Sequence, residues 1–305
     1  MIIKLAIKDL CFSYHSDEGV LTSVTALLAQ DKNDKKNKND PKDKKCEEGK
    51  DGGECSKENK EVLQDFSLNI GDGQIVSIVG PNGSGKSTLI KCIDRLLNPS
   101  AGEILVDRQD VTKMNRIDLA RRIAYVPQNA LRVFPNTVFD VVLMGRRPYL
   151  GWKGGTMDDM VVWEMLQLLD LEDKALKTFT ELSGGQQQKV LIARALAQET
   201  GVILLDEPTS NLDIWHQIDV MEIIRMLVKK RNLTAIIAIH DLNMAARYSD
   251  TIVMMKKGKI VANGKPDAVM TGENLEQVYG IRANVKIADD IPYIMPLSRI
   301  LPKTG

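Results

Sequence analysis

Two acidic residues stand side by side at the end of an apolar run. The stretch LLDEPTSNLDIWH begins at Leu204, and the carboxylates of Asp206 and Glu207 follow residues typical of a buried strand. Burying a carboxylate is unfavourable unless the group is paired or binds a metal ion. The pair therefore predicts both a cation and a reaction at this point of the fold.

A glycine-rich stretch elsewhere in the chain predicts where that cation binds. GPNGSGKS, residues 80–87, matches the pattern G-x-x-x-x-G-K-[ST] and follows a β-branched run, with a helical pattern after it. Such a loop turns its backbone N–H groups toward phosphates, and the helix adds its positive N-terminus. We call residues 80–87 the phosphate loop. The residues expected to bind ATP here are Gly80, Pro81, Asn82, Gly83, Ser84, Gly85, Lys86, Ser87 and Thr88.

The two motifs together define a reaction. Lys86 is expected at the β- and γ-phosphates, and the Ser87 hydroxyl is expected to bind Mg²⁺. Asp206 is then the second anchor of the magnesium ion, as in nucleotide hydrolases with this loop. Glu207 is left to orient and deprotonate the water that attacks the γ-phosphate. The expected cofactors are ATP and Mg²⁺.

Length and composition narrow the class of protein. The chain has 305 residues, of which 43% are hydrophobic, and its 41 basic side chains balance 41 acidic ones. That balance argues against a nucleic-acid partner held by a strong positive field. No apolar run approaches the roughly 18 residues of a membrane span, and the start lacks a signal peptide. We expect a cytosolic chain.

The N-terminal part changes character after its first strand. Residues 2–14 alternate loosely and predict an edge strand. Between Asp31 and Glu61 there are ten lysines and ten acids, so this segment cannot bury enough apolar surface to order itself. We predict a disordered polar insertion at residues 16–60. Cys46 and Cys55 fall inside it at a spacing unusual for zinc, and we expect free thiols.

The remaining pattern indicates an α/β fold. Short buried-type strands are predicted at residues 75–79, 202–206 and 234–239, with helical stretches between them. Residues 251–264 predict a hairpin that turns at Lys257–Gly258. Strands that alternate with helices favour a mainly parallel sheet.

One further motif indicates a family. In LSGGQQQKV, residues 182–190, Ser183 and Gln186 form a capping box that predicts a helix start. Gly184 and Gly185 are poor helix formers but permit close approach to a ligand. LSGGQ is the signature of ATP-binding-cassette (ABC) proteins, and the chain closely resembles their nucleotide-binding subunit nearly everywhere except residues 16–60.

The resemblance implies a domain organisation. It gives a single ABC ATPase domain, residues 1–305, with a P-loop NTPase core, a mainly parallel sheet and an antiparallel β-subdomain. An α-helical subdomain is inserted at residues 129–186, and residues 265–305 form a C-terminal extension.

The resemblance also assigns roles to single residues. Tyr14, in CFSY, looks like the aromatic residue that stacks on adenine. Gln128 looks like the glutamine that senses the γ-phosphate and Mg²⁺, and His240 like the switch histidine at the γ-phosphate. His15 and His216 match no motif and are expected at the surface. The residues that face the ATP of a partner subunit are Ser183, Gly184, Gly185, Gln186 and, in the crossing loop SNLD (residues 210–213), Asp213.

The implied partners follow from this arrangement. A second copy, or a similar ATPase chain, completes two sandwiched nucleotides, and a transmembrane permease docks on the helical subdomain at the cytoplasmic face of the membrane. A substrate-binding protein acts indirectly. Residues 134–152 and 269–287 resemble importers of iron(III)–siderophore, haem and cobalamin. The side chains that look exposed for docking on the permease are aromatic residues and arginines, namely Phe134, Tyr149, Trp152, Arg146 and Arg147.

Three other classes of protein are alternatives, and one feature of the sequence argues against each. Soluble ABC ATPases of DNA repair or translation carry long coiled coils or two cassettes, neither of which is seen here. Exporter motors are usually fused to membrane segments, which this chain lacks. A binding module without turnover would need Glu207 or Lys86 replaced, and both are present.

Overall fold

The computed structural model describes residues 3–14, 60–128, 136–149 and 156–300. The chain divides into a larger compact unit, residues 1–12 and 62–305, and a smaller unit, residues 13–61. The fold and site described below belong to the larger unit. The predicted insertion lies outside the described residues except for Lys60, which begins a strand, and Cys46 and Cys55 lie outside them as well.

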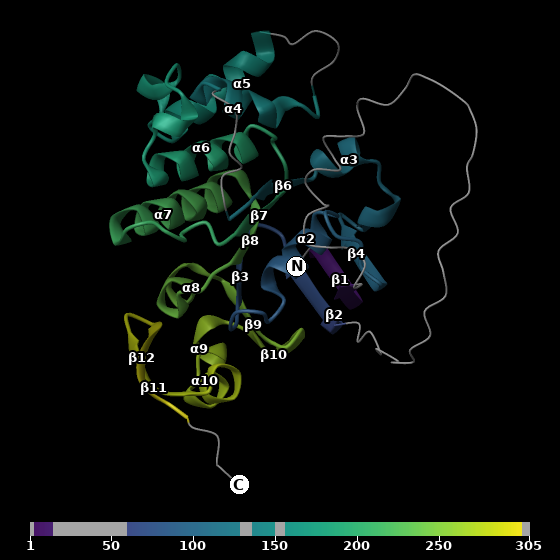
Figure 1. Cartoon of the computed structure of the whole chain (residues 1–305), viewed down its shortest axis with the longest axis vertical. Coiled ribbons are helices and arrows are strands. Elements are labelled where there is room, and N and C mark those ends of the chain that lie inside the picture. The colour runs from purple at the N-terminus through teal and green to yellow at the C-terminus, as the bar shows by residue number, and fades with distance from the viewer. Residues whose placement is uncertain (1–2, 15–59, 129–135, 150–155, 301–305) are drawn as a thin grey trace, which may run out of the picture. The chain divides into compact units, whose positions relative to one another are not determined.

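A mainly parallel sheet forms the centre of the larger unit (Figure 1). Its strand order is β10-β9-β3-β8-β7-β6, and the pairings among β9, β3, β8, β7 and β6 are all parallel, whereas β10 pairs with β9 antiparallel. The strands are β3 (Ile75–Val79), β6 (Ile123–Val126), β7 (Val202–Asp206), β8 (Thr234–Ala238), β9 (Thr251–Lys256) and β10 (Lys259–Gly264). This confirms the predicted α/β fold class.

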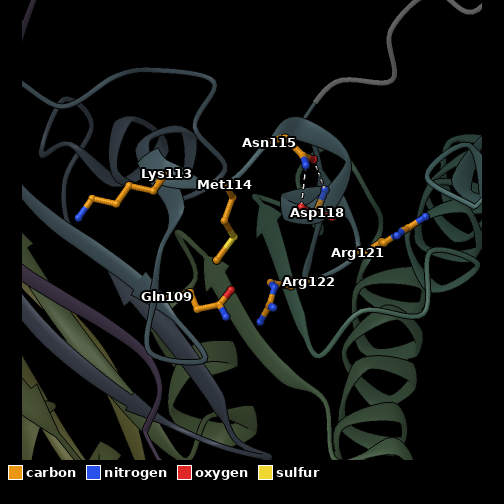
Figure 2. Close-up of a pocket in the computed structure, with 7 residues that line it drawn as sticks. All are labelled: Gln109, Lys113, Met114, Asn115, Asp118, Arg121 and Arg122. Carbon is orange, nitrogen blue, oxygen red and sulfur yellow. Dashed lines mark hydrogen bonds between the residues drawn. The ribbon is translucent and has the colours of Figure 1, made fainter.

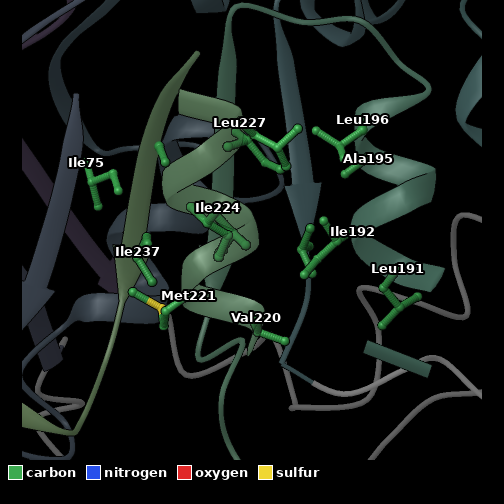
Figure 3. Packing of buried hydrophobic residues seen from close by; sticks show 14 of the residues in the cluster. Ile75, Leu191, Ile192, Ala195, Leu196, Val220, Met221, Ile224, Leu227 and Ile237 are labelled. Carbon is green, nitrogen blue, oxygen red and sulfur yellow. The ribbon is translucent and has the colours of Figure 1, made fainter. Parts of the chain in front are cut away.

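Helices bury both faces of this sheet, which explains the continuous apolar runs in its strands. On one face lie α6 (Gly184–Leu196) and α7 (Ile214–Arg231), where Ile192, Ile224 and Ile237 belong to one packed cluster (Figure 3). On the other face, α2 (Lys86–Ile93) packs Leu89 and Ile90 against the alternate residues of the strands. The side chains of β3 divide between the two clusters accordingly, as period-two alternation requires.

The second sheet is antiparallel where its register is described, as the resemblance implied. Its order is β2-β1-β4-β5, from β1 (Ile3–Tyr14), β2 (Lys60–Gly71), β4 (Ala101–Val106) and β5 (Gln109–Asp110). The prediction that β1 is an edge strand was wrong, because β1 lies between β2 and β4. Alternation reports which face of a strand is buried, here the side of Leu5 and Ile7, but says nothing about how many strands flank it.

The described residues between β6 and β7 are mainly helical. They comprise α4 (Val138–Leu143), η2 (Met144–Arg146), α5 (Thr156–Leu168), η3 (Glu172–Lys174), η4 (Phe179–Glu181) and α6. A bridge between Thr137 and Thr178 joins the residue before α4 to the residue before η4. Before β6 lie η1 (Val111–Lys113) and α3 (Arg116–Ala120). The bounds 129–186 for a helical subdomain stay a prediction, and α6 continues beyond them to Leu196.

The C-terminal elements pack onto the core. After α8 (Leu242–Tyr248) come α9 (Pro266–Val269), α10 (Gly272–Tyr279) and the hairpin of β11 (Ile281–Ala288) and β12 (Ile291–Arg299). Leu275 and Ile294 join the main apolar cluster. The Asn243 amide both donates to and accepts from the Ile294 backbone, at 3.2 and 2.8 Å, which fastens β12 to α8. Figure 1 shows the hairpin beside α8.

Among the helices of the described residues, none combines the length and the apolar character needed to cross a membrane.

Candidate active site

The phosphate loop connects β3 to α2, as its sequence context predicted. Gly85, the residue before the helix, has φ +105°, and a Cβ there would lie 2.9 Å from a Leu63 methyl group. Gly83 has φ +76°. Side-chain-bearing residues rarely adopt these conformations, so glycine at these two positions lets the loop curl back over the helix N-terminus.

Lys86 lies inside that curl. Its ammonium donates to the carbonyl oxygens of Gly80 at 2.8 Å and Pro81 at 3.2 Å, and the residue is only 5% exposed. Burial lowers the pKa of Lys86, whereas the charges of Glu207 and then Asp206 act to raise it. The sequence predicts that this lysine contacts phosphates. In the structure its ammonium lies at the phosphate loop, close enough to Glu207 and Asp206 for their charges to act on it.

Asp206 is the last residue of β7 and meets the first turn of α2. The Ser87 hydroxyl donates to Asp206 Oδ1 at 2.8 Å, and Asp206 is 3% exposed. Burial raises the pKa of this carboxyl, and the hydrogen bond from Ser87 opposes the shift. A hydroxyl and a carboxylate oxygen this close together are hard oxygen ligands, the kind that Mg²⁺ prefers. The two side chains therefore fit a magnesium site.

Glu207 turns away from the strand that Asp206 ends. Its φ is +52°, a left-handed conformation that is uncommon outside glycine and often found at functional sites. Its carboxylate contacts the Gln128 amide through one oxygen and the His240 ring through the other. Its side chain is 12% exposed. Three residues that the sequence assigned to the γ-phosphate thus meet around one carboxylate.

Sheet topology explains why these residues meet. Gln128 follows β6, Asp206 ends β7 and Glu207 comes directly after it, His240 follows β8, and the phosphate loop follows β3. These four strands are parallel, so their carboxyl ends lie at the same edge of the sheet. Ligand sites of open α/β sheets are found outside that edge.

Tyr125 is a neighbour of this site that sequence reasoning missed. It lies on β6 opposite Leu204 of β7, and its hydroxyl reaches the Asp206 carboxylate. Burial raises the pKa of the Tyr125 hydroxyl, and the charges of Asp206 and Asp94 add to the shift. A single tyrosine in an apolar strand carries no signal that distinguishes such a contact from ordinary core packing.

The signature residues form a helix start. Ser183 is the N-cap of α6, and both hydrogen bonds of the predicted capping box with Gln186 are present, at 3.2 and 3.4 Å. Asp213 caps α7 through a 2.9 Å bond from the His216 backbone N–H. Within the described part of the chain, no hydrogen bond or ion pair joins these residues to the phosphate loop. Their expected ligand, the ATP of a partner, stays a prediction.

Tyr14 ends β1 and is 45% exposed. It belongs to the smaller of the two units, residues 13–61, so its predicted stacking on adenine is not tested by this structure.

Arg146 differs from the expectation of an exposed docking residue. It is 7% exposed, and its guanidinium donates to Asp158 at 2.9 Å, Glu199 at 2.6 Å and the Ala197 carbonyl at 2.8 Å. It also lies 4.4 Å from the centre of the Tyr149 ring. The prediction was wrong because the enrichment of arginine at interfaces says nothing about one arginine whose N–H groups already have partners within the chain. Arg147 is exposed, and Phe134 and Trp152 lie outside the described residues.

The adjacent arginines allow a direct test of this finding. Arg146→Ala leaves the half-buried Asp158 and the Ala197 carbonyl without their donor, so we expect a loss of about 3 kcal/mol in unfolding free energy. Arg147→Ala removes an exposed side chain and should change it by less than about 0.5 kcal/mol. Urea unfolding of both variants measures the difference, and equal losses would contradict the assignment.

A cavity of about 430 Å³ lies away from the phosphate loop, among β5, η1 and α3. In Figure 2, Gln109, Met114 and Arg122 lie toward the middle of this group, whereas Lys113 and Arg121 point away. Both arginines already have partners, because Arg122 pairs with Asp107 at 3.3 Å and Arg121 donates to the Pro148 carbonyl. We therefore assign the chemistry to the strand edge and not to this cavity.

Comparison with known proteins decides the family. The ABC transporter family model matches residues 63–210. An ABC transporter ATP-binding protein of Methanocaldococcus jannaschii is 44% identical over 247 residues, which is 81% of this chain and 96% of that protein. The chain belongs to the family of ABC transporter ATP-binding proteins. As an ABC ATP-binding protein it is an ATPase, and its nucleotide is ATP.

Two further relatives of this ABC ATPase carry names that state a cargo. The ferric enterobactin transport ATP-binding protein FepC of Escherichia coli is 38% identical over 249 residues, 80% of this chain and 92% of that protein. The cobalamin import ATP-binding protein BtuD of Halobacterium salinarum is 42% identical over 224 residues, 73% of this chain and 56% of that protein.

Solved structures resemble the ABC ATPase over most of its length. An ABC transporter assigned to the metal-chelate type, in an inward-facing conformation, matches with a TM-score of 0.73 and 26% identity, covering 97% of this chain and 98% of that one. A dimeric ATP-binding cassette bound to ADP and phosphate matches with a TM-score of 0.65 and 28% identity, covering 86% and 98%. The individual roles of Lys86, Glu207 and the other site residues remain predictions.

Proposed function

We propose that the chain binds and hydrolyses ATP to power an importer of metal chelates of the iron–siderophore type. The observation that carries the catalytic part is the Glu207 carboxylate, which lies between Gln128 and His240 at the same sheet edge as Lys86. The cargo class is supported by the name of the relative FepC and by the metal-chelate transporter of similar fold.

The site supplies each requirement of the reaction. The phosphate loop and the N-terminus of α2 present N–H groups and a positive dipole to the phosphates, and the Lys86 ammonium adds a full charge. Ser87 and Asp206 would hold Mg²⁺, which neutralises charge on the phosphate oxygens. Glu207 accepts a proton from the attacking water. The oxygen of that water bonds to the γ-phosphorus while the bond between the γ-phosphorus and the ADP oxygen breaks.

Gln128 and His240 act on that carboxylate and on the phosphate beside it. Both hold Glu207 through its two oxygens, which fixes the direction in which it meets the water. The exposed ring of His240, 43% accessible, can also donate to the γ-phosphate.

The proposal includes a two-chain assembly. The capped helix start at Ser183–Gln186, with Asp213, faces the ATP held by the phosphate loop of a second copy or of a similar chain. A dimeric relative of 28% identity supports this pairing. The dimer docks on a transmembrane permease at the cytoplasmic face of the membrane. A substrate-binding protein delivers the chelate from the other side. No nucleic acid takes part.

Cobalamin is a second candidate cargo, because a relative named for cobalamin import is 42% identical. The cargo is tested by reconstituting the ATPase in proteoliposomes with a transmembrane permease that binds it. We expect ATP-dependent uptake of a radiolabelled ferric siderophore when its binding protein is present. Uptake of cobalamin alone would favour the second candidate, and uptake of neither would contradict metal-chelate import.

Coupling to the permease gives a further prediction for Arg147. This side chain is exposed, so Arg147→Ala should keep basal ATPase activity within about twofold. Permease-stimulated activity should fall about tenfold, because an arginine in an interface often contributes strongly to binding. Tyr149 is left unchanged, since its hydroxyl donates to the Gln198 carbonyl at 3.0 Å and supports the fold. Equal losses of basal and stimulated activity would contradict a docking role.

A further inference from the structure

His216 was expected to be an ordinary surface residue, and the structure gives it two specific contacts. It lies in the first turn of α7, where its ring Nδ1 is 2.7 Å from Oδ1 of Asp213, the same oxygen that accepts its backbone N–H. The Trp215 ring meets it edge-on, with centroids 4.9 Å apart. Its side chain is 31% exposed, so the ring is partly enclosed by these groups.

Another side of the ring lies against the signature residues. A Cβ at Gly185 would be 2.7 Å from His216 Cγ and 2.9 Å from its Nε2, so the imidazole fills the space that any side chain at position 185 would need. At the neighbouring Gly184, a Cβ would meet Leu212 at 3.8 Å, which is an ordinary contact. Glycine is a poor helix former, and at position 185 the ring supplies a reason for its presence.

The crossing loop, residues 210–213, is fixed on its other side to Glu207. The backbone N–H and the hydroxyl of Ser210 donate to the Glu207 carbonyl at 3.1 and 2.9 Å. The Gln217 amide donates to the carbonyls of Thr209 and Leu212 at 3.3 and 3.0 Å. A continuous set of short contacts therefore runs from Glu207 through the crossing loop to His216, and from His216 to Gly185.

We propose that His216 is a positioning residue that holds the signature turn, residues 183–186, against the crossing loop. The two segments then reach the partner's nucleotide as one preformed surface, so less order is lost when the dimer closes. His216 itself touches no nucleotide. This inference rests on the proposed function, because the partner's ATP is what the preformed surface meets.

The consequence is measured in the Glu207→Gln background, where hydrolysis does not intervene. His216→Ala should raise the ATP concentration that drives half-maximal dimerisation about tenfold, whereas ATP affinity of the dilute monomer should stay within about twofold. A merely structural role would weaken dimerisation and monomer ATP binding together, or would change neither. Sedimentation velocity measures the first quantity, and fluorescence of a labelled ATP analogue the second.

Two conservative variants separate the contacts. His216→Asn keeps a hydrogen-bond donor near Asp213 but removes the ring from Gly185, and His216→Phe does the reverse. If the ring contact positions the turn, Phe restores most of the dimerisation and Asn does not. Dimerisation of all three variants at the ATP concentration of the Glu207→Gln parent would overturn the proposal.

A double-mutant cycle tests the contact itself. Gly185→Ala should destabilise the chain and weaken dimerisation at least tenfold through overlap with the ring. Adding His216→Ala should recover most of the lost unfolding free energy, whereas dimerisation should stay at the level of His216→Ala alone, because the positioning ring is gone. Gly184→Ala is the matched control, and His216→Ala should not improve it. Absence of recovery at Gly185, or equal recovery at Gly184, overturns the proposal.

The cycle also separates this inference from the proposed function. Recovery of unfolding free energy in the double variant, together with normal ATP-driven dimerisation of His216→Ala alone, would overturn the positioning role and leave the ATPase assignment standing. Failure of the unmodified chain to hydrolyse ATP would instead contradict the proposed function, and the unfolding cycle would still report whether the contact exists.

Discussion

Lys86→Ala is expected to abolish measurable ATP turnover and to weaken ATP binding on the order of 10³-fold, the effect of removing a buried charge that faces phosphates. The ammonium lies between the phosphate-loop carbonyls of Gly80 and Pro81, with the charges of Glu207 and Asp206 nearby. Alanine leaves the curl of the loop intact but without a cation. Phosphate release and equilibrium ATP binding measure the two effects.

The matched control is Lys113→Ala, which removes a lysine whose side chain is 80% exposed and pairs with Asp110. We expect its turnover and ATP affinity to equal those of the unmodified chain, because exposed ion pairs contribute little. Near-normal ATPase activity in Lys86→Ala would remove the phosphate loop from the reaction.

Glu207→Gln is expected to lower the rate of hydrolysis about 10³-fold while ATP and Mg²⁺ affinities stay close to normal, since a general base typically contributes 10²- to 10⁴-fold. The amide has the shape of the carboxylate and can still contact Gln128 and His240, but it cannot take a proton from water. Single-turnover hydrolysis, compared with binding of Mg-ATP, measures the separation.

The neighbouring acid provides the contrast. Asp206→Asn keeps an oxygen for the Ser87 hydroxyl, now 2.8 Å from the carboxylate, but removes the charge that would hold Mg²⁺. We expect this variant to need a much higher magnesium concentration, which Glu207→Gln does not. Similar magnesium requirements in both variants would contradict the separate roles given to the two acids.

Local chemistry made much of this site predictable from sequence. The strands at residues 75–79 and 202–206 have the predicted bounds, because β-branched and apolar runs of that length are typical of a sheet covered on both faces. The capping box at Ser183 is present because its two hydrogen bonds involve residues three positions apart. Parallel strands end at a common edge, which is why the loops after β3, β6, β7 and β8 meet there.

Other features depend on contacts between distant parts of the chain. The position of β1 between β2 and β4, the burial of Arg146 among two carboxylates, and the approach of His216 to Gly185 each require the packed structure. Periodicity encodes which face of an element is buried but not which element covers it. For the same reason Tyr125 could not be distinguished from a core residue before its neighbours were known.

The central claim is a two-chain ATP site in which Glu207 activates water. Native mass spectrometry of Glu207→Gln with Mg-ATP tests it most directly, because one spectrum counts chains and identifies the bound nucleotide. The account predicts a dimer that carries two unhydrolysed ATP molecules. A monomer with bound ATP, or a dimer that holds ADP, would contradict it.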